Sequence, residues 1–321
     1  MKTFILLIGL LVAIQSRAQE EVRDYRPYYA GATYNESDVI VLRSFERLGT
    51  RYFFMVDCHT LQTQIIPAKN VKAKVDSWSN LKDRYTTTPY VKALTAAQSQ
   101  SFALQDAGIV HGYPKEHGIT LTVDLCPSHK PLDRAVFTAL IAEFAKIEKP
   151  VPVALSLSGR FMLTHLEDLH WLKSLEADGY LKITWVNHTY NHHYEPQVPL
   201  QENFLLKPGT DINFEVLETE IAMITQGLCP SVFFRFPGLV SDNAIVSKIT
   251  GFGLLPIGSD AWLAKGQQSA PGSIVLIHGN GNEPVGVSDF IHLLESKKDF
   301  VLQKEWLMYD LRESVAHEFE D

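Results

Sequence analysis

Residues 118–147 read GITLTVDLCPSHKPLDRAVFTALIAEFAKI and place a strand, a short loop and a helix in one stretch. The alternating apolar and threonine side chains over 119–123 are typical of a buried strand. Residues 133–147 carry apolar side chains at helical spacing, and Asp133 stands before them as a predicted N-cap. The stretch therefore predicts one strand–loop–helix unit.

The same unit repeats along the chain. Further strands are predicted at 151–157, 181–186, 232–236, 254–257 and 273–277, and further helices at 164–177, 212–227, 241–250 and 287–297. Strands that alternate with helices form parallel sheets that the helices cover. We therefore expect an α/β fold with its functional side chains at the carboxyl ends of the strands.

The segment before residue 113 has a different pattern. Alternation over 39–42 and 52–56 predicts two strands, and residues 48–50 predict the turn between them. Residues 76–106 are predicted to be a helical connector. The expected organisation is a signal peptide over 1–18, a β-rich region with its connector over 19–112, and the strand–helix domain over 113–321.

The chain starts with MKTFILLIGLLVAIQSRAQEE, a basic residue followed by an apolar run. The run is shorter than the roughly 20 apolar residues that a membrane span needs. Small residues, Ser16 and Ala18, stand where a signal peptidase could cut. These features predict a secreted or periplasmic protein with no membrane span after cleavage.

The composition narrows the class further. The 321 residues include 29 Lys+Arg and 37 Asp+Glu, a net charge of −8, with 45% hydrophobic residues. This balance is typical of a folded protein, and without a basic run it argues against nucleic-acid binding. Cys58, Cys126 and Cys229 are an odd number, so one disulfide with a free thiol and three free thiols both stay open.

Reactive side chains follow five of the predicted strands. In chain order they are Asp124, His188 with His192, Arg235, Asp260 with Trp262, and His278. Two imidazoles four residues apart on a helical turn can share one divalent ion, although ordinary polar loop residues are the alternative. Asp124 ends an apolar strand and needs a cation, for which Arg235 is the obvious partner. The sequence therefore predicts a metal centre with acid–base groups.

These residues resemble the polysaccharide deacetylases of carbohydrate esterase family 4, whose shared unit is the NodB homology domain. The family's T-F-D-D-G-P, H-[ST]-x-x-H, R-x-P-Y, Asp-near-Trp and L-x-H motifs correspond to residues 122–127, 188–192, 235–238, 260–262 and 276–278, and the second is matched completely. The matches come in order over about residues 117–300. The resemblance implies a distorted (β/α) barrel of NodB type, with a small β-rich N-terminal region beside it.

The resemblance also implies an activity. Members bind one divalent ion, usually zinc, and hydrolyse N- or O-acetyl groups from a carbohydrate, so an acetylated carbohydrate is the expected partner. By this resemblance His188 and His192 are metal ligands, Asp124 is the base, Arg235 orients the base, and His278 is the acid.

Five more positions belong to the predicted site. By the resemblance, Asp260 would tune the acid and Leu276 would line the pocket for the acetyl methyl. Trp262 is either a platform for the substrate sugar or a core side chain. Pro237 and Gly238 would line the groove, although Gly238 stands where the family has tyrosine. The substrate pocket is therefore expected to lack one aromatic side chain.

The largest departure from the family is at Leu125, which replaces the aspartate that normally serves as the third metal ligand. Leucine cannot coordinate a metal. The candidates for a replacement are Cys126, Asp124, Asp133, His129 and His193. Two functions stay open: a metal-dependent deacetylase with a rearranged ligand set, and a catalytically impaired protein of this fold that binds carbohydrate.

Overall fold

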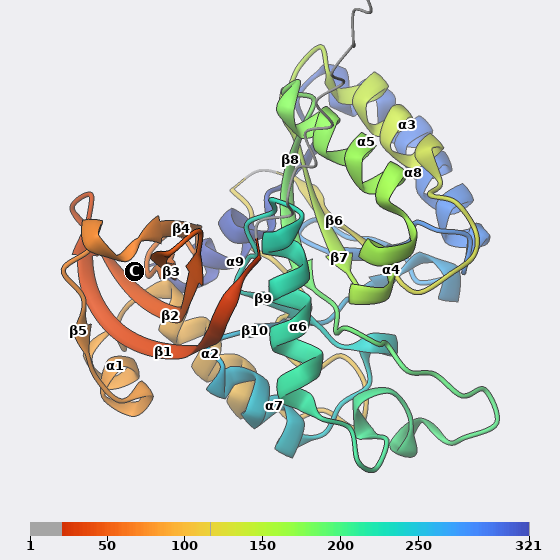
Figure 1. Ribbon diagram of the computed structural model, residues 1–321. Helices are drawn as coiled ribbons and strands as arrows, with labels where there is room; N and C mark the ends of the chain where they lie inside the picture. The colour runs from red at the N-terminus through yellow and green to blue at the C-terminus, as the bar shows by residue number, and fades with distance from the viewer. Residues whose placement is uncertain (1–20, 116, 321) are drawn as a thin grey trace, which may run out of the picture.

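The computed structural model describes residues 21–115 and 117–320 (Figure 1). The predicted signal peptide, residues 1–18, lies outside the described residues. Within the described ranges, no helix is both long enough and apolar enough to span a membrane.

The chain begins with an antiparallel sheet whose strand order is β4-β3-β2-β1-β5. The strands are β1 (Arg23–Tyr34), β2 (Ser37–Arg47), β3 (Thr50–Asp57), β4 (Thr63–Pro67) and β5 (Lys74–Val75). The predicted strands at 39–42 and 52–56 lie in β2 and β3. The predicted turn joins them, with Leu48 and Gly49 at positive φ of 51° and 70°.

Two helices, α1 (Trp78–Arg84) and α2 (Pro89–Ser99), follow this sheet. They confirm the helical character predicted for residues 76–106. A segment without regular helices or strands then leads to the second sheet.

The second sheet is parallel, with strand order β10-β9-β8-β7-β6-β12-β11 and β13 paired to β6. Its strands are β6 (Gly118–Leu125), β7 (Val151–Leu157), β8 (Leu181–Asn187), β9 (Phe233–Arg235), β10 (Leu255–Ile257), β11 (Ala261–Trp262), β12 (Ile274–His278) and β13 (Leu307–Met308). Helices cover the curled sheet (Figure 1). The distorted (β/α) barrel predicted from the sequence is confirmed.

The helices after β6 are α3 (Arg134–Phe144), α4 (Gly159–Thr164), α5 (Leu166–Ala177), α6 (Ile212–Thr225), α7 (Asn243–Gly251), α8 (Pro284–Leu302) and α9 (Leu311–Phe319). Short 3₁₀ segments are η1 (Ala68–Asn70), η2 (Leu200–Glu202), η3 (Phe204–Leu206), η4 (Pro237–Leu239) and η5 (Leu263–Lys265). The helix predicted over 164–177 corresponds to α5. The sequence did not predict β1, β4, β5, α4, β11, β13 or α9.

Asp133 precedes α3 as predicted, but its side chain makes no capping hydrogen bond. Its Oδ2 accepts a hydrogen bond from the Gly281 N–H at 3.1 Å. The predicted side-chain cap is therefore wrong, because the loop after β12 takes up the carboxylate.

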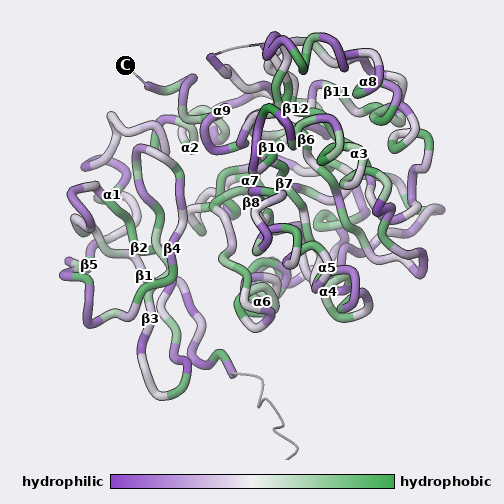
Figure 2. The backbone as a smooth tube through the Cα atoms, turned by 90° about the horizontal axis from the view of Figure 1, so that it is seen from above, coloured by the Kyte–Doolittle hydropathy of each residue, from purple (hydrophilic) through white to green (hydrophobic). Residues whose placement is uncertain are grey.

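Alternation along β6 divides its side chains between two faces. Leu121, Val123 and Leu125 are buried in the core between the sheet and helices α3, α5 and α8. Figure 2 shows apolar residues along the central strands and many hydrophilic ones on the surrounding helices. Because successive strand residues point to opposite faces, Asp124 and the next even position, Cys126, share the face opposite Leu125.

The antiparallel sheet is joined to the barrel by a shared core and a buried ion pair. Ile40 and Phe54 pack in one cluster with Val186 and Leu255 of the parallel sheet, among others. The ion pair, between Arg43 of β2 and Glu220 of α6, has no exposed side-chain surface. The two sheets therefore form one packed unit.

Candidate metal and acid–base site

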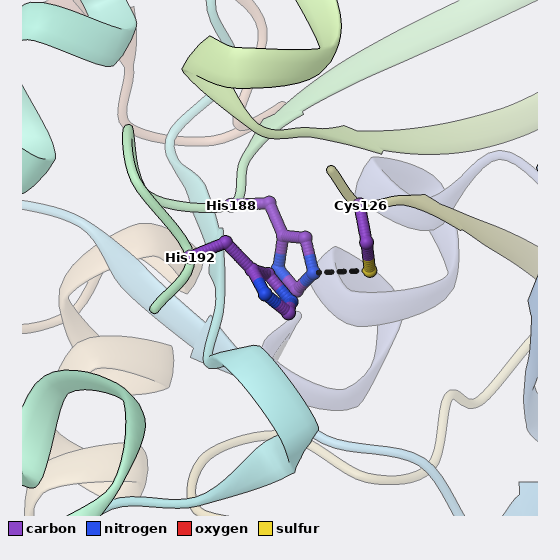
Figure 3. A group of neighbouring side chains, drawn as sticks. All are labelled: Cys126, His188 and His192. Atoms are coloured by element: carbon purple, nitrogen blue, oxygen red, sulfur yellow. Dashed lines mark hydrogen bonds between the residues drawn. The ribbon is translucent and has the colours of Figure 1, made fainter. Parts of the chain in front are cut away.

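Three potential metal ligands meet where β6 and β8 end. Cys126 follows β6, His188 follows β8, and their Sγ and Nε2 atoms lie 3.5 Å apart. With His192 they form a group whose ligand atoms all lie within 4.8 Å of one another (Figure 3). The structure thus brings the two predicted ligands together and adds one of the five candidates for the third.

The histidine pair is formed by a loop. Thr189 and His192 have positive φ of 66° and 48°, so the predicted helical turn is wrong. The imidazole centroids are nevertheless 4.7 Å apart. Glu215 of α6 holds the loop, since its Oε2 accepts hydrogen bonds from the backbone N–H groups of residues 190 and 191 at 2.9 and 2.8 Å.

The two imidazoles are oriented as metal ligands would be. His188 Nδ1 lies 2.8 Å from the Arg235 carbonyl oxygen, so this nitrogen donates and Nε2 is left to face Cys126. His192 Nε2 is buried and has no hydrogen-bond partner. A buried polar atom without a partner calls for an explanation, and two imidazoles with a thiolate are ligands that zinc prefers. The residues therefore fit a zinc ion.

The surroundings favour the thiolate form of Cys126. Burial alone would raise the pKa of the thiol. When His192 and His278 are protonated, their positive charges and the close contacts of the thiol with the imidazoles outweigh burial and hold that pKa well below its usual value. Because the thiolate is the form that binds metal, this environment suits a ligand.

Asp124 and Arg235 lie beside the ligand group, and both are almost fully buried. Asp124 Oδ2 is 3.7 Å from His188 Nε2, and Oδ1 is 3.8 Å from Arg235 Nε. The predicted partner is present, but the separation exceeds a direct hydrogen bond. Asp124 Oδ1 and two Arg235 nitrogens, Nε and Nη1, have no hydrogen-bond partner. Both residues of this ion pair therefore have polar atoms that are available to bind another group.

His278, the last residue of β12, has a carboxylate neighbour that the sequence analysis missed. Its Nδ1 lies 2.9 Å from Glu283 Oε2, just before α8. The carboxylate lies off the direction of the N–H bond, so the contact is a close ion pair and not an aligned hydrogen bond. Trp262 Nε1 donates to the same Oε2 at 2.7 Å. Glu283 therefore links two of the predicted site residues.

The environment of His278 favours its protonated form. Burial alone would lower the pKa of the imidazole. The negative charges of Cys126 and Asp124, with the close contacts that the imidazole makes to Cys126 and Glu283, raise that pKa well above its usual value. A protonated imidazole at this position has a proton to donate.

Asp260 has other partners. Its Oδ2 lies 2.6 Å from His111 Nδ1, and its Oδ1 accepts a hydrogen bond from the backbone N–H of Ile274 at 3.0 Å. The carboxylate in contact with His278 is Glu283. The tuning of the acid by Asp260 stays a prediction.

Two hollows open beside these groups. The reaction hollow, about 790 Å³, is lined by residues that include Cys126, His192, Gly238, Trp262, His278 and Glu283. The side hollow, about 630 Å³, is lined by residues that include Arg160, Asn191, His192, Lys207 and Pro237. Leu276 is buried on the same face of β12 as His278 and lines neither hollow.

The other candidate ligands lie outside the group. Asp133 binds Gly281 as described, His129 is exposed, and His193 Nε2 lies 2.7 Å from Glu195 Oε1. Cys58, Cys126 and Cys229 are all free thiols, which resolves the alternatives that the sequence left open.

Known proteins resemble two parts of the chain. Residues 23–91 match the family described as RP012 protein N-terminal domain. A family 4 carbohydrate esterase from Bacillus anthracis has 19% identity and a TM-score of 0.45, over 66% of this chain and 87% of that chain. A counterpart from Streptomyces lividans has 15% identity and a TM-score of 0.41, over 60% of this chain and 91% of that chain.

Another similar structure is a family 4 pseudoenzyme from Bacillus anthracis. It has 15% identity and a TM-score of 0.44, over 70% of this chain and 81% of that chain. These structures come from the family that the five motifs resemble. The scores describe a distant likeness of the chain trace.

Proposed function

We propose that this chain is a metal-dependent deacetylase that hydrolyses N- or O-acetyl groups of a carbohydrate. The observation that carries the proposal is the Cys126–His188–His192 group, with Asp124 beside it. These three residues would hold a zinc ion, with Cys126 in place of the carboxylate that Leu125 cannot supply. A bound zinc ion would polarise the acetyl carbonyl and lower the pKa of its water.

Asp124 is the proposed general base. Its Oδ1 has no hydrogen-bond partner, so a lone pair is available to accept a proton from the attacking water. Arg235 places a permanent positive charge 3.8 Å away, which attracts the carboxylate electrostatically. Burial excludes bulk water from both side chains and strengthens this electrostatic effect.

His278 is the proposed general acid, which protonates the leaving nitrogen or oxygen of the sugar. Glu283 and Trp262 are positioning residues, because the carboxylate contacts both the imidazole and the indole N–H. Asp260 acts at longer range. Its hydrogen bond from the Ile274 N–H fixes the start of the strand that ends in His278.

We also propose the rest of the substrate site and the organisation of the chain. Gly238 and Trp262 would contact the sugar in the reaction hollow, Pro237 would do so in the side hollow, and Leu276 would back the acetyl pocket. Residues 1–18 would be a cleaved signal that sends the protein outside the cytoplasm, with a β-rich region over 19–112 and the catalytic domain over 113–321. N-terminal sequencing of the secreted protein tests the cleavage.

The decisive test combines metal content with acetate release. After incubation with zinc and desalting, the mature protein should retain about one ion per chain and release acetate from acetylated oligosaccharides. Cys126→Ser should lose the ion and the activity, whereas Cys126→Asp, which restores an oxygen ligand, should recover part of both. Wild-type protein that retains no zinc would overturn the proposal and favour a carbohydrate-binding protein without catalysis.

A further inference from the structure

The side hollow takes no part in the proposed hydrolysis beyond the sugar contact assigned to Pro237, although it adjoins the reaction hollow. Both hollows are lined by Pro127, His192, Tyr194 and Phe204. His192 is a proposed metal ligand, so the two spaces meet beside the reaction centre. A ligand that fills the reaction hollow could extend into the side hollow past these residues.

The boundary between the hollows is an aromatic pair. The Phe204 ring meets His192 edge-on, with centroids 5.6 Å apart and an interplanar angle of 85°. Tyr194 stacks on Phe204, with centroids 5.1 Å apart and an angle of 15°. A Cβ atom added at Gly238 would lie 2.7 Å from Phe204 ring carbons. Phe204 therefore occupies space that a side chain at position 238 would need.

Hydrogen bonds join the two ends of the loop that carries Tyr194 and Phe204. Asn203 is fully buried, and its Oδ1 accepts a hydrogen bond from the Glu195 N–H at 3.0 Å. Its Nδ2 donates to the carbonyl oxygens of Glu195 and Val198 at 2.7 and 3.2 Å. Because the start and the end of the loop are joined, the aromatic pair is held in place before any ligand binds.

Tyr194 and the side hollow together offer the chemistry that binds a sugar ring. The Tyr194 residue is 53% exposed, although its ring already stacks on Phe204. Arg160, Asn191 and Lys207 line the side hollow. Some of their N–H groups already donate to Asn191, Glu215 and Glu195, and the others are donors that a ligand can use. A sugar ring has an apolar C–H face that packs on an aromatic ring and a rim of hydroxyl groups that accept such hydrogen bonds.

We propose that the side hollow is a second sugar-binding subsite with Tyr194 as its stacking platform. The ligand class is then an oligosaccharide whose acetylated unit lies in the reaction hollow and whose neighbouring unit lies against Tyr194. The position of the acetylated unit rests on the proposed function. Binding of the neighbouring unit does not, since it requires no catalysis.

The test measures binding of β-1,4-linked N-acetylglucosamine oligomers of one to four units to the zinc-loaded protein by calorimetry. The Kd should fall at least about tenfold from the monomer to the tetramer, equivalent to about 1.4 kcal/mol. Tyr194→Ala should raise the tetramer Kd about tenfold, and Tyr194→Phe, which keeps the ring, should stay near wild type. Tyr113→Ala is the matched control, because Tyr113 is also 53% exposed and lines neither hollow.

Three results would overturn the second subsite: no binding of the tetramer, equal affinity for monomer and tetramer, or an unchanged tetramer Kd in Tyr194→Ala. Unfolding midpoints of the variants check that each one folds. Length-dependent binding without acetate release from any acetylated oligosaccharide would keep the subsite and overturn the proposed reaction. The two proposals therefore fail in different ways.

Discussion

Two buried arginine–carboxylate pairs in this molecule differ in how completely they are satisfied. Arg43 donates to both oxygens of Glu220, at 2.8 and 3.0 Å, and to the Phe252 carbonyl oxygen at 2.7 Å. Arg235 comes no closer than 3.8 Å to Asp124, and atoms of both lack hydrogen-bond partners. Unpaired buried polar atoms cost free energy, so their concentration at one place indicates function there.

The largest expected effect is on stability, through the fully hydrogen-bonded Arg43–Glu220 pair. Glu220→Gln leaves the Arg43 guanidinium buried without a countercharge, so the free energy of unfolding should fall by about 3–5 kcal/mol, measured by urea denaturation. Glu218→Gln is the control, because Glu218 lies on the same helix and is partly exposed. A loss below about 1 kcal/mol would show that the Arg43–Glu220 pair does not hold the sheet to the barrel.

The Asp124–Arg235 pair should respond in the opposite way. Asp124→Asn removes the proposed base, so acetate release should fall about 10²–10⁴-fold. The free energy of unfolding should fall by less than in Glu220→Gln, because no direct hydrogen bond to Arg235 is lost and the Asp106 carboxylate supplies a second negative charge near the guanidinium. A stability loss as large as that of Glu220→Gln would make Asp124–Arg235 a structural pair as well.

Glu283 should have a smaller effect on rate. Glu283→Gln keeps the shape but removes the charge beside His278, so kcat should fall roughly 10- to 100-fold while KM stays within about twofold. Glu283→Asp should recover part of the kcat, which a merely structural role would not predict. Equal losses in the Gln and Asp variants would contradict a positioning role for the charge.

The sequence predicted some residues of the candidate site and missed others. Strand alternation located Asp124, His188, Arg235 and His278 at strand ends, because each follows an apolar run that only a buried strand explains. The same alternation separates Leu125 from Cys126, yet it cannot say that the thiol reaches His188, because that distance depends on the loop after β8.

Other features depend on how loops fold back in three dimensions. Phe204 fills the space beside Gly238, and the two are far apart in the sequence. Glu283 reaches His278 only because the loop before α8 turns back over the site. Neither relation has a local pattern, so neither could be derived from spacing or periodicity.

The smallest expected effect concerns a second carboxylate with all-protein partners, Asp310 at the start of α9. Burial alone would raise its pKa, but hydrogen bonds and ion pairs with Arg312 and Lys182 hold the pKa below its usual value. A carboxylate with a lowered folded-state pKa stabilises the protein above its unfolded-state pKa, roughly 4, and loses that contribution as pH falls through the folded value.

Asp310→Asn should therefore cost about 1 kcal/mol of unfolding free energy at pH 7, and the difference from wild type should shrink as pH falls below about 4. Asparagine still caps a helix, so the hydrogen bond that Oδ1 accepts from the Arg312 N–H at 2.9 Å has a replacement and only the charge is lost. A difference that stays constant from pH 7 to pH 3 would mean that packing, and not charge, makes Asp310 stabilising. Asp310 and Glu220 would then contribute to stability through packing. They would differ from Asp124 only in their hydrogen bonding.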